Sequence, residues 1–426
     1  MARAPSVRLR ALAFATSIFV GLQAVALAGP MEDGAAAYGR GDYALALRIW
    51  KPIATRGDPG TQLNIGIMYL RGQGVSEDDA EAVSWFRRSA DQGFAGAQSE
   101  LGHLYRNGQG VPKDEANAVA WFRKAALQDH ADAEANLAEM LDRGPGAPQD
   151  HAAALKWDFK AAQQGNVQAE TNLGVHYEFG VGTPRDFAKA MTWFLKAADQ
   201  GDADAENHIG GMYAVGEGVA VDFAKAMKWQ RKAADQGNAY AQHQVGLMLE
   251  HGKGLPQDMD AAISWYRRAA EQGERHAQVK MAVLYRQGPG LARDDVEARN
   301  WMRKAADQDY APAEYYLGVM YERGAAGVPR DYAQALALQK SAAEQGFAPA
   351  QFDLGALYAN GQGTTRDYLQ AFIWISLSVD KMPADYADLH DLAEKGVSTL
   401  TSKLTPTQIT EAQHQIRDWR PTHVVD

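Results

Sequence analysis

Residues Ala169–Asp204 read AETNLGVHYEFGVGTPRDFAKAMTWFLKAADQGDAD, and this unit sets the architecture of the whole chain. Its tryptophan belongs to a series that returns every 36 residues and resumes at Trp374 after a shift of one residue. A period of this length is typical of a solenoid, because each unit exposes an apolar face that only its neighbour can cover. The regularly spaced members of the series are Trp85, Trp121, Trp157, Trp193, Trp229, Trp265 and Trp301.

Within this unit, small and apolar residues return at three- and four-residue intervals, as they do on one face of an α-helix. Ala169, Leu173, Gly174 and Tyr177 share that face. Gly174 costs about 1 kcal/mol of helix propensity relative to alanine, so we interpret it as a point where two helices meet closely. A second helix carries Trp193 and an alanine pair, and we expect the tryptophans to be core residues. The unit is therefore predicted to be an antiparallel helix pair.

An aspartate precedes the second helix in every full unit. A carboxylate at this place accepts hydrogen bonds from the free backbone N–H groups of the first turn, and such a cap is worth about 1 kcal/mol. A calcium-binding repeat is the alternative, but no second carboxylate follows at a fixed two-residue spacing, as the ligand number of calcium would require. We therefore predict helix caps at Asp78, Asp114, Asp150, Asp186, Asp222, Asp258, Asp294, Asp331 and Asp367.

The repeat pattern divides the rest of the chain into an array and its two ends. Residues 29–60 are predicted to hold a short linker, Pro30–Gly34, and a partial repeat that caps the array. Residues 61–385 hold nine full repeats. Residues 386–426 are predicted to be a C-terminal helical cap and tail, with a closing helix that starts near Thr405.

Residues 1–28 have the features of a cleavable secretory signal peptide. Three arginines precede an apolar run that ends in Ala26-Leu27-Ala28, a pattern that predicts cleavage after Ala28. An uncleaved membrane anchor is the alternative, but the small residues and the cleavage pattern favour removal. The chain contains no cysteine, and export without disulfides is compatible with a bacterial periplasm. We expect a periplasmic or secreted protein.

The charge of the chain limits its partners. The net charge is −10, and removal of the signal peptide takes away only positive charges, so the mature chain is more acidic still. A surface of this sign disfavours nucleic acids and anionic membranes as partners. The longest apolar run after the signal, Ala371–Val379, is too short to span a bilayer. We expect a mature chain that binds neither nucleic acid nor membrane and is a monomer.

One combined pattern, Ala-x3-Leu-Gly-x2-Tyr-x2-Gly-x-Gly-Val-x2-Asp-x3-Ala-x2-Trp-x3-Ala-Ala-x2-Gly, extends from about Gly34 to Asp385. It resembles the Sel1-like repeat, a relative of the tetratricopeptide repeat. The resemblance implies an all-α superhelical solenoid of antiparallel helix pairs that serves as an adaptor or scaffold in signalling, envelope biogenesis or host interaction. One subset of the family has been linked to penicillin binding and β-lactamase activity, but its repeats carry paired cysteines that this chain lacks.

Binding determinants are expected at positions that vary between repeats, because solenoids bind partners on a variable surface. In related helical repeats the first helix lines the concave face, which corresponds here to positions three, four, seven, ten and eleven of each unit. Adjacent tyrosines in the eighth unit are expected to be the main anchors, because aromatic residues dominate interface hot spots. The predicted partner-binding residues are Glu100, His103, Arg106, Asn172, Glu178, Phe179, His243, Glu250, Tyr315, Tyr316, Glu322 and Arg323.

The sequence therefore predicts a non-catalytic adaptor for a protein or peptide, with no cofactor and no metal. An envelope scaffold that recognises glycan or peptidoglycan is the first alternative. The second is a penicillin-interacting hydrolase, suggested by Ser378-Val379-Asp380-Lys381, which has the Ser-x-x-Lys spacing of such enzymes. The companion Ser-Asp-Asn and Lys-Thr-Gly motifs are absent from the sequence, which disfavours that reading.

Overall fold

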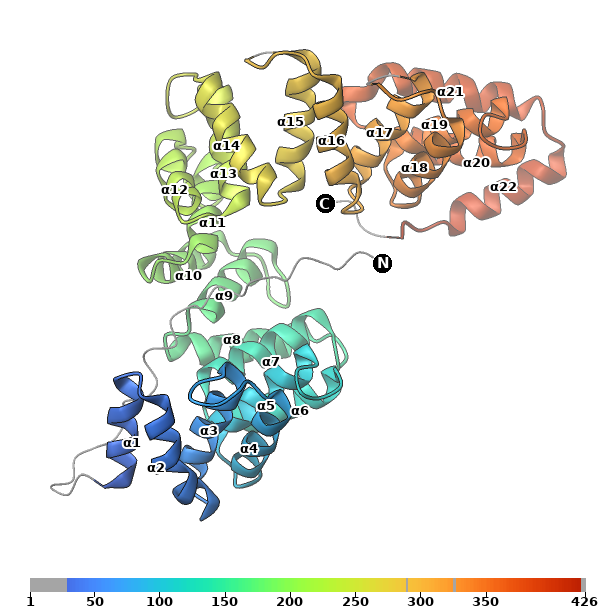
Figure 1. Ribbon diagram of the computed structural model, residues 1–426. Coiled ribbons are helices and arrows are strands. Elements are labelled where there is room, and N and C mark those ends of the chain that lie inside the picture. The colour runs from blue at the N-terminus through green and yellow to red at the C-terminus, as the bar shows by residue number, and fades with distance from the viewer. Residues whose placement is uncertain (1–28, 289, 325–326, 423–426) are drawn as a thin grey trace. The chain divides into compact units, whose positions relative to one another are not determined.

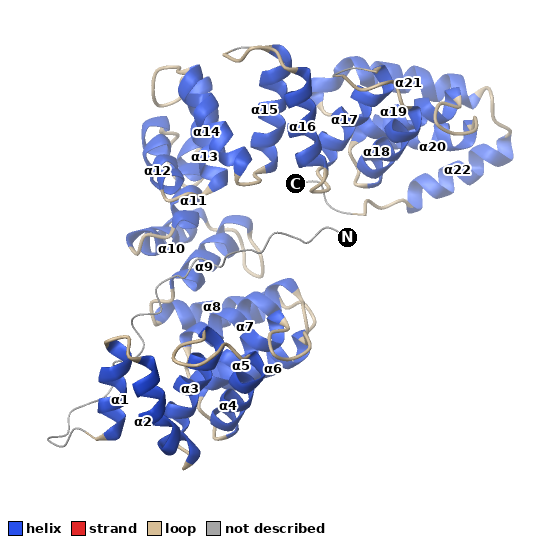
Figure 2. Cartoon of the chain, in the orientation of Figure 1, coloured by secondary structure: helices blue, strands red, loops and turns tan. Residues whose placement is uncertain are grey.

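The computed structural model describes residues 29–288, 290–324 and 327–422. These residues form α-helices and one short 3-10 helix, and they contain no strand (Figures 1 and 2). The chain divides into two compact units, Met1–Asn166 and Val167–Asp426. The expected all-α solenoid of helix pairs is confirmed.

Helices α1 to α8 belong to the first unit and α9 to α22 to the second. The first unit contains α1 (Pro30–Gly39), α2 (Tyr43–Thr55), α3 (Pro59–Arg71), α4 (Asp79–Asp91), α5 (Ala95–Asn107), α6 (Glu115–Ala126), α7 (Ala131–Arg143) and α8 (His151–Gln163). The second contains α9 (Val167–Phe179), α10 (Phe187–Asp199), α11 (Ala203–Val215), α12 (Phe223–Asp235), α13 (Ala239–Glu250), α14 (Met259–Glu271), α15 (Arg275–Gln287), α16 (Asp295–Ala306), α17 (Ala311–Arg323), α18 (Tyr332–Glu344), α19 (Ala348–Asn360), α20 (Tyr368–Val379), η1 (Ala384–Tyr386), α21 (Ala387–Thr401) and α22 (Pro406–Asp418).

Each full repeat is one helix pair. The odd-numbered helices from α3 to α19 are the first helices, and each packs against the even-numbered helix that follows it. The predicted aspartate cap is present at the start of every second helix from α4 to α20, where the side chain accepts a hydrogen bond from the backbone N–H three residues further on. In α10, for example, Asp186 accepts from the N–H of Lys189.

The glycine at the sixth position of the first helix lies against the residue that follows the tryptophan. A Cβ added to Gly174 would lie 2.3 Å from the ring of Phe194, a distance that no real contact allows. Phe194 has no exposed surface. Where alanine replaces this glycine, at Ala138 and Ala282, the facing position holds no ring but Asp158 and Met302. The glycine is therefore retained for the close approach of two helices, as the sequence predicted.

The tryptophans are less uniformly buried than expected. Trp85, Trp265, Trp301 and Trp374 are buried, but the tryptophans of the four repeats between Trp85 and Trp265 are half-buried. In these repeats a lysine three residues further on covers the outer ring face; the Nζ of Lys196, for instance, lies 3.9 Å from the ring centre of Trp193. The residue after the tryptophan forms the deeper core. The tryptophans of these four repeats are therefore only partly buried, although Trp121, Trp157 and Trp229 still pack against the core.

A side-chain hydrogen bond joins the two helices of each of the first eight repeats. The glutamine at the end of the second helix donates from Nε2 to a glutamine or glutamate in the first helix of the same repeat, 30 or 31 residues earlier, at 2.7 to 2.8 Å. Burial raises the pKa of Glu134, Glu170 and Glu314, the acceptors in three of these hydrogen bonds. The repeat pattern did not predict these hydrogen bonds.

The two ends of the array are closed by helices. The predicted linker Pro30–Gly34 instead forms the first turns of α1, with proline at the start of the helix, where its missing N–H is not needed. At the other end, Thr405 and Gln408 form a capping box that starts α22, as predicted. The ring of Trp419 packs edge-on against Trp374, at 6.3 Å between ring centres. None of the described helices is long and apolar enough to cross a membrane.

Candidate functional site

Positions three, four, seven, ten and eleven of the first helices form a surface that we call the first-helix face. In the second compact unit of the chain, Val167–Asp426, position seven of the repeat holds a small or apolar residue in every first helix from α9 to α19. All of these residues are half-buried, so each remains in part accessible. We call them the apolar row: Val175, Gly211, Leu247, Val283, Val319 and Ala356.

Gly211 is the member of the row for which no contact within the described chain requires a glycine. The preceding residue, Gly210, faces Gln230, whose side chain lies 2.8 Å from an added Cβ. A Cβ on Gly211 would meet no heavy atom of the described residues within 4 Å, apart from its chain neighbours and helix backbone. A mid-helix glycine costs about 1 kcal/mol relative to alanine, and no internal contact repays that cost here. The first-helix face is open at this point.

Aromatic residues precede the members of the apolar row along the first helices, by one or two helical turns or at the start of the helix. His243 lies one turn before Leu247 and is 8% exposed, and its ring centre is 5.8 Å from that of His276. His276 in turn contacts Tyr310 at 5.1 Å between ring centres. Burial lowers the pKa of His243 to about 4, so this imidazole is neutral at pH 7. Its Nδ1 has no hydrogen-bond partner among the described residues.

Tyr240 and a second group of tyrosines extend this surface. Tyr240 is 46% exposed and lies 6.3 Å from His276 between ring centres. Towards the C-terminus, the hydroxyl groups of Tyr316 and Tyr386 are 2.8 Å apart. Both tyrosines are half-buried. We call the set Tyr240, His243, His276, Tyr310, Tyr316 and Tyr386 the aromatic strip.

Tyr315 does not lie on the surface as an accessible anchor. Its side chain is 7% exposed, and its ring packs against Phe347 and Tyr386 at 5.4 and 6.4 Å between ring centres. Burial raises the pKa of its hydroxyl. Of the two tyrosines predicted to be anchors, only Tyr316 is more than marginally accessible, because Phe347 and Tyr386, the last residue of η1, pack against the ring of Tyr315.

Several charged residues predicted to bind a partner are paired with the next repeat. Position ten of one first helix contacts position four of the following one, 30 residues on. Glu178 lies 2.7 Å from Nδ1 of His208, and Glu250 lies 2.7 Å from Nζ of Lys280. Glu250 also accepts a hydrogen bond from the hydroxyl of Tyr266, at 2.6 Å. Both carboxylates are thus engaged by side chains of the next repeat.

The first unit shows the same kind of pairing. Arg106 donates from Nη1 to Asn136 and Glu139, at 3.1 and 3.2 Å. His103 stacks edge-on against Phe122, and burial with nearby Arg106 lowers its pKa to about 4. Burial raises the pKa of Glu100. These three predicted residues share a face, but it lacks the continuous apolar row of the second unit, since position seven holds Ile67, His103 and Glu139.

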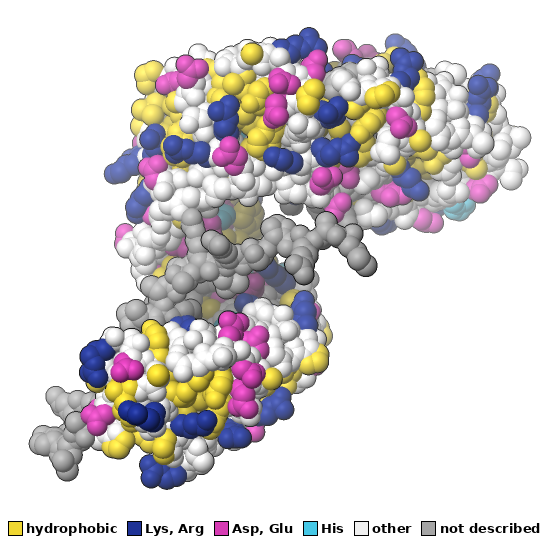
Figure 3. All heavy atoms as spheres, viewed as in Figure 1, with side chains coloured by type: hydrophobic (Ala, Val, Ile, Leu, Met, Phe, Trp, Pro, Cys, Tyr) yellow, Lys and Arg dark blue, Asp and Glu magenta, His cyan; other side chains and the backbone are white. Residues whose placement is uncertain are grey.

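The remaining predicted residues differ in accessibility. Phe179 is 63% exposed at position eleven, and Val215, at the same position of the next repeat, is 69% exposed. Asn172 accepts a hydrogen bond from Gln168 at 3.0 Å. On the visible face of each unit, basic and acidic side chains are interspersed with hydrophobic ones (Figure 3). Position eleven therefore extends the apolar surface at this end of the second unit.

Glu322 and Arg323 lie near Asp353, which sequence reasoning did not select. Burial and the neighbouring Glu322 raise the pKa of Asp353 to about 7, and Arg323 partly opposes that rise. Asp353 is at position four of its repeat, and Glu322 is at position ten of the preceding repeat. Glu250 and Lys280 occupy the same two positions, but here both residues are acidic.

The stability of the protein is expected to depend on Asp353 between pH 4 and pH 8. Its folded pKa lies above the unfolded value of 3.8, so ionisation disfavours the folded state as the pH rises through about 7. Asp353→Asn should therefore raise the melting temperature relative to the unchanged protein at pH 8, with little difference at pH 4. Thermal melts followed by circular dichroism would check this. An equal difference at both pH values would contradict it.

Two other groups of residues are weaker candidates for a functional site. Ser378 is fully buried and its hydroxyl donates to the carbonyl of Ile375, while Lys381 lies over the ring of Trp419. The Ser-x-x-Lys motif thus presents no accessible nucleophile.

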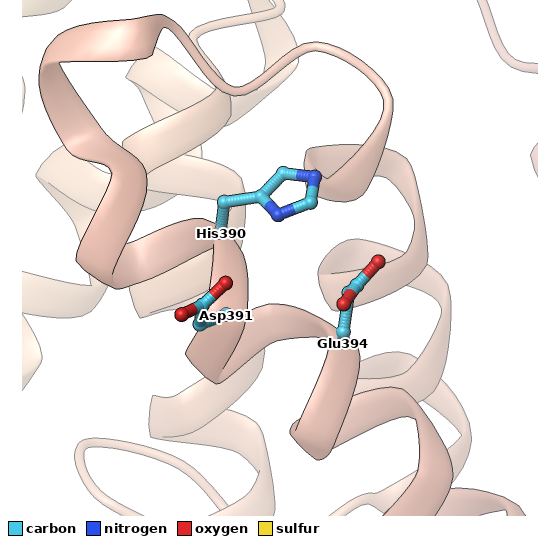
Figure 4. A group of neighbouring side chains, drawn as sticks. All are labelled: His390, Asp391 and Glu394. Carbon is cyan, nitrogen blue, oxygen red and sulfur yellow. The ribbon is translucent and has the colours of Figure 1, made fainter.

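His390, Asp391 and Glu394 lie close together on α21, with ligand atoms within 4.8 Å of one another (Figure 4). Both carboxylates are exposed, and exposed acidic groups of this kind are common without an ion.

The segments matched by a known repeat family coincide with the helix pairs of the structure. The Sel1 repeat model matches the segments 60–94, 95–130, 131–166, 167–202, 203–238, 239–274, 275–310, 311–347 and 348–381. The crystal structure of c5321, a protective antigen of uropathogenic Escherichia coli with an SLR fold, is 31% identical, with 92% of this chain and 91% of that chain covered and a TM-score of 0.54. A Sel1 repeat protein from Oxalobacter formigenes is 29% identical over 56% of this chain and 96% of its own, also with a TM-score of 0.54. No curated protein matches the chain.

Paired helices stacked with a 36-residue period and a variable first-helix face define a helical-repeat protein, a class that commonly serves as a scaffold for protein interactions. The nine segments that match the Sel1 repeat model cover most of the chain and identify its family within this class. The chain belongs to the Sel1 repeat family.

Proposed function

We propose that this chain is a non-catalytic, exported adaptor that binds a protein partner through the first-helix face of its second unit. The observation that carries this proposal is the apolar row, which stays half-exposed from α9 to α19 and is open at Gly211. The signal-like residues 1–28 lie outside the described structure, and they support export to the periplasm or the medium, where the mature chain acts as a monomer. A role in envelope signalling or biogenesis fits that location.

Substitution of exposed apolar residues on this face tests the proposal. The double variant Phe179→Glu with Val215→Glu places two charges on side chains that are mostly exposed, so folding should be unaffected while an apolar contact with a partner is lost. Leu127→Glu is the matched control, because Leu127 is 69% exposed, as Val215 is, but lies in the first unit. Cross-linking and affinity capture from envelope extracts, read by mass spectrometry, should lose a partner with the double variant and keep it with the control.

An identical set of captured proteins for all three chains would contradict this assignment of the face. Circular dichroism of each variant serves as the check on folding. N-terminal sequencing of the exported protein should give Gly29 as the first residue if the signal peptide is cleaved after Ala28.

A glycan-binding envelope scaffold is the second candidate. The half-exposed rings of Tyr240 and Tyr310 favour it, because aromatic rings with a polar tip present both apolar faces and hydrogen-bonding groups. Co-sedimentation with purified peptidoglycan distinguishes the two candidates, since an adaptor for proteins should stay in the supernatant.

A further inference from the structure

The first-helix face of the second unit pairs charges between neighbouring repeats, and one of these pairs lacks a cation. The first helices of this unit that carry a glutamate at position ten have Glu178, Glu250 and Glu322 there. The residue at position four of the next repeat is His208 for the first and Lys280 for the second, each 2.7 Å from the carboxylate. For the third it is Asp353, a second acid.

Neither carboxylate of this acidic pair is held by another side chain of the described chain. The side chains of Glu322 and Asp353 form no hydrogen bond and no ion pair with the described residues. Arg323 lowers the pKa of Asp353 through its charge, but its side chain is exposed and is not in an ion pair with either acid. Both carboxylates are half-buried. Like charges at such a place repel each other unless a cation joins them.

The hydroxyl group of Tyr315 is a third oxygen at this point. The side chain is 7% exposed, and its hydroxyl forms no hydrogen bond with the described residues. Burial and the negative charge of Asp353 raise the pKa of this hydroxyl, which places it beside that carboxylate. A buried hydroxyl group without a hydrogen bond is unfavourable. The site therefore offers two carboxylates and one hydroxyl, all without a partner among the described residues.

The chemistry of these oxygens favours a guanidinium group over a metal ion or an ammonium group. Calcium takes about six to eight oxygen ligands, but Glu322 and Asp353 belong to no described group of three histidine or carboxylate side chains with ligand atoms within 4.8 Å. A guanidinium group spreads its N–H donors over a rigid plane and bridges acceptors, whereas an ammonium group is a strongly hydrated point charge. It also stacks on aromatic rings, and the half-buried ring of Tyr316 lies 5.2 Å from that of Tyr315 between ring centres.

The surroundings on the face are compatible with a cationic side chain at this point. Val319 and Ala356, the members of the apolar row on α17 and α19, lie three residues along the helix from the two acids, so a partner on the row reaches them. Arg286, at position ten of the repeat before, is exposed, and with Arg293 it lowers the pKa of Asp295. The net charge of −10 adds a longer-range attraction for a basic partner.

We propose, on the basis of the proposed function, that Glu322, Asp353 and the hydroxyl group of Tyr315 bind an arginine side chain of the protein partner. The arginine occupies the place beside Glu322 that Lys280 occupies beside Glu250. The partner thus supplies the cation that this repeat lacks, while its apolar side chains lie on the apolar row.

Variants of the mature full-length chain test the site at pH 8, where the Asp353 carboxyl group is ionised. Asp353→Lys places a cation in the site, as Lys280 does beside Glu250, and should abolish arginine binding. Asp353→Asn should weaken binding by about tenfold or more, and its higher melting temperature at this pH excludes loss of folding as the cause. Tyr315→Phe should weaken binding by about threefold. Glu271→Gln, at an exposed residue of α14, is the control for loss of one negative charge and should leave binding unchanged.

Selection from a phage-displayed library of random peptides supplies the probe. The unchanged protein is the target, and peptides that also bind the Asp353→Lys variant are removed. The enriched peptides should share an arginine. A synthetic peptide from this set, labelled with fluorescein, then gives dissociation constants by anisotropy. Replacement of its arginine by citrulline, which has a similar shape without the charge, should weaken binding by about tenfold or more.

Three results would overturn the arginine site. They are a set of enriched peptides without a shared arginine, equal affinity of the peptide with citrulline or lysine in place of arginine, and binding that is insensitive to Asp353→Asn. Calorimetric titration with calcium chloride alone addresses the metal alternative. Heat of binding that is lost in Asp353→Asn would indicate a calcium site and also overturn the proposal.

These outcomes separate the arginine site from the proposed function. A captured envelope protein that is lost with Phe179→Glu and Val215→Glu but kept with Asp353→Lys would refute the arginine site and leave an adaptor that uses the same face. Capture that is unaffected by the double variant would contradict the proposed function whatever the peptide library yields.

Discussion

Phe194→Ala is expected to lower the free energy of unfolding locally by about 3–5 kcal/mol, because it deletes a fully buried ring and leaves a cavity between two helices. Trp193→Ala should cost less, although its side chain is larger, because Trp193 is half-buried and covered on one face by Lys196. Leu195→Ala, at a neighbouring position that is 39% exposed, is the control and should cost least. Native-state hydrogen exchange of α9 and α10 measures these differences directly, since unfolding of a repeat array need not be two-state.

A larger effect of Trp193→Ala than of Phe194→Ala would contradict this order. It would mean that the tryptophan series, and not the residue after it, forms the energetic core of each repeat. The distinction matters because the tryptophan is the more obvious residue in the sequence, whereas burial assigns the greater role to its neighbour.

Gly174→Ala is expected to destabilise the same helix pair by about 1–3 kcal/mol. The added methyl group would lie 2.3 Å from the buried ring of Phe194, and this overpacking outweighs the gain of about 1 kcal/mol in helix propensity. The seventh repeat suggests the remedy, since Ala282 there faces Met302, which is also buried. Combining Gly174→Ala with Phe194→Met should therefore recover part of the loss.

A double-mutant cycle by hydrogen exchange or urea unfolding checks this coupling. The combined variant should be more stable than the sum of the single changes predicts, by about 0.5–3 kcal/mol. Strict additivity would show that Gly174 is retained for some reason other than the Phe194 ring.

Most of the fold was predictable because its determinants lie inside one repeat. The period of the tryptophans and the capping aspartates are both local. The residue that follows each second helix is set locally as well: it is mostly a glycine with a positive φ angle, and Asp129 and Asp309, which take its place in two repeats, have φ angles of 58° and 56°. The linker at Pro30–Gly34 was mistaken because a proline followed by acidic residues suits the start of a helix as well as a loop.

The candidate site was less predictable because its contacts join different repeats. The face was chosen by helix position, but the sequence could not show that Glu250 is held by Lys280 or that Tyr386 covers Tyr315. The apolar row was visible in principle, because position seven is small or apolar in every repeat of the second unit. Position seven was expected to face the groove, but His103 was the only residue at that position selected as a binding residue.

The side-chain hydrogen bond within each repeat has a consequence for the length of the array. Both members of each bond lie inside one repeat, as Gln236 and Glu206 do, because they are 30 or 31 residues apart within a period of 36. Loss of the 36 residues from 205 to 240 would therefore remove one complete bond and leave every other bond of this kind with both of its members. The number of repeats can then change without leaving a single unpaired glutamine or glutamate of this kind behind.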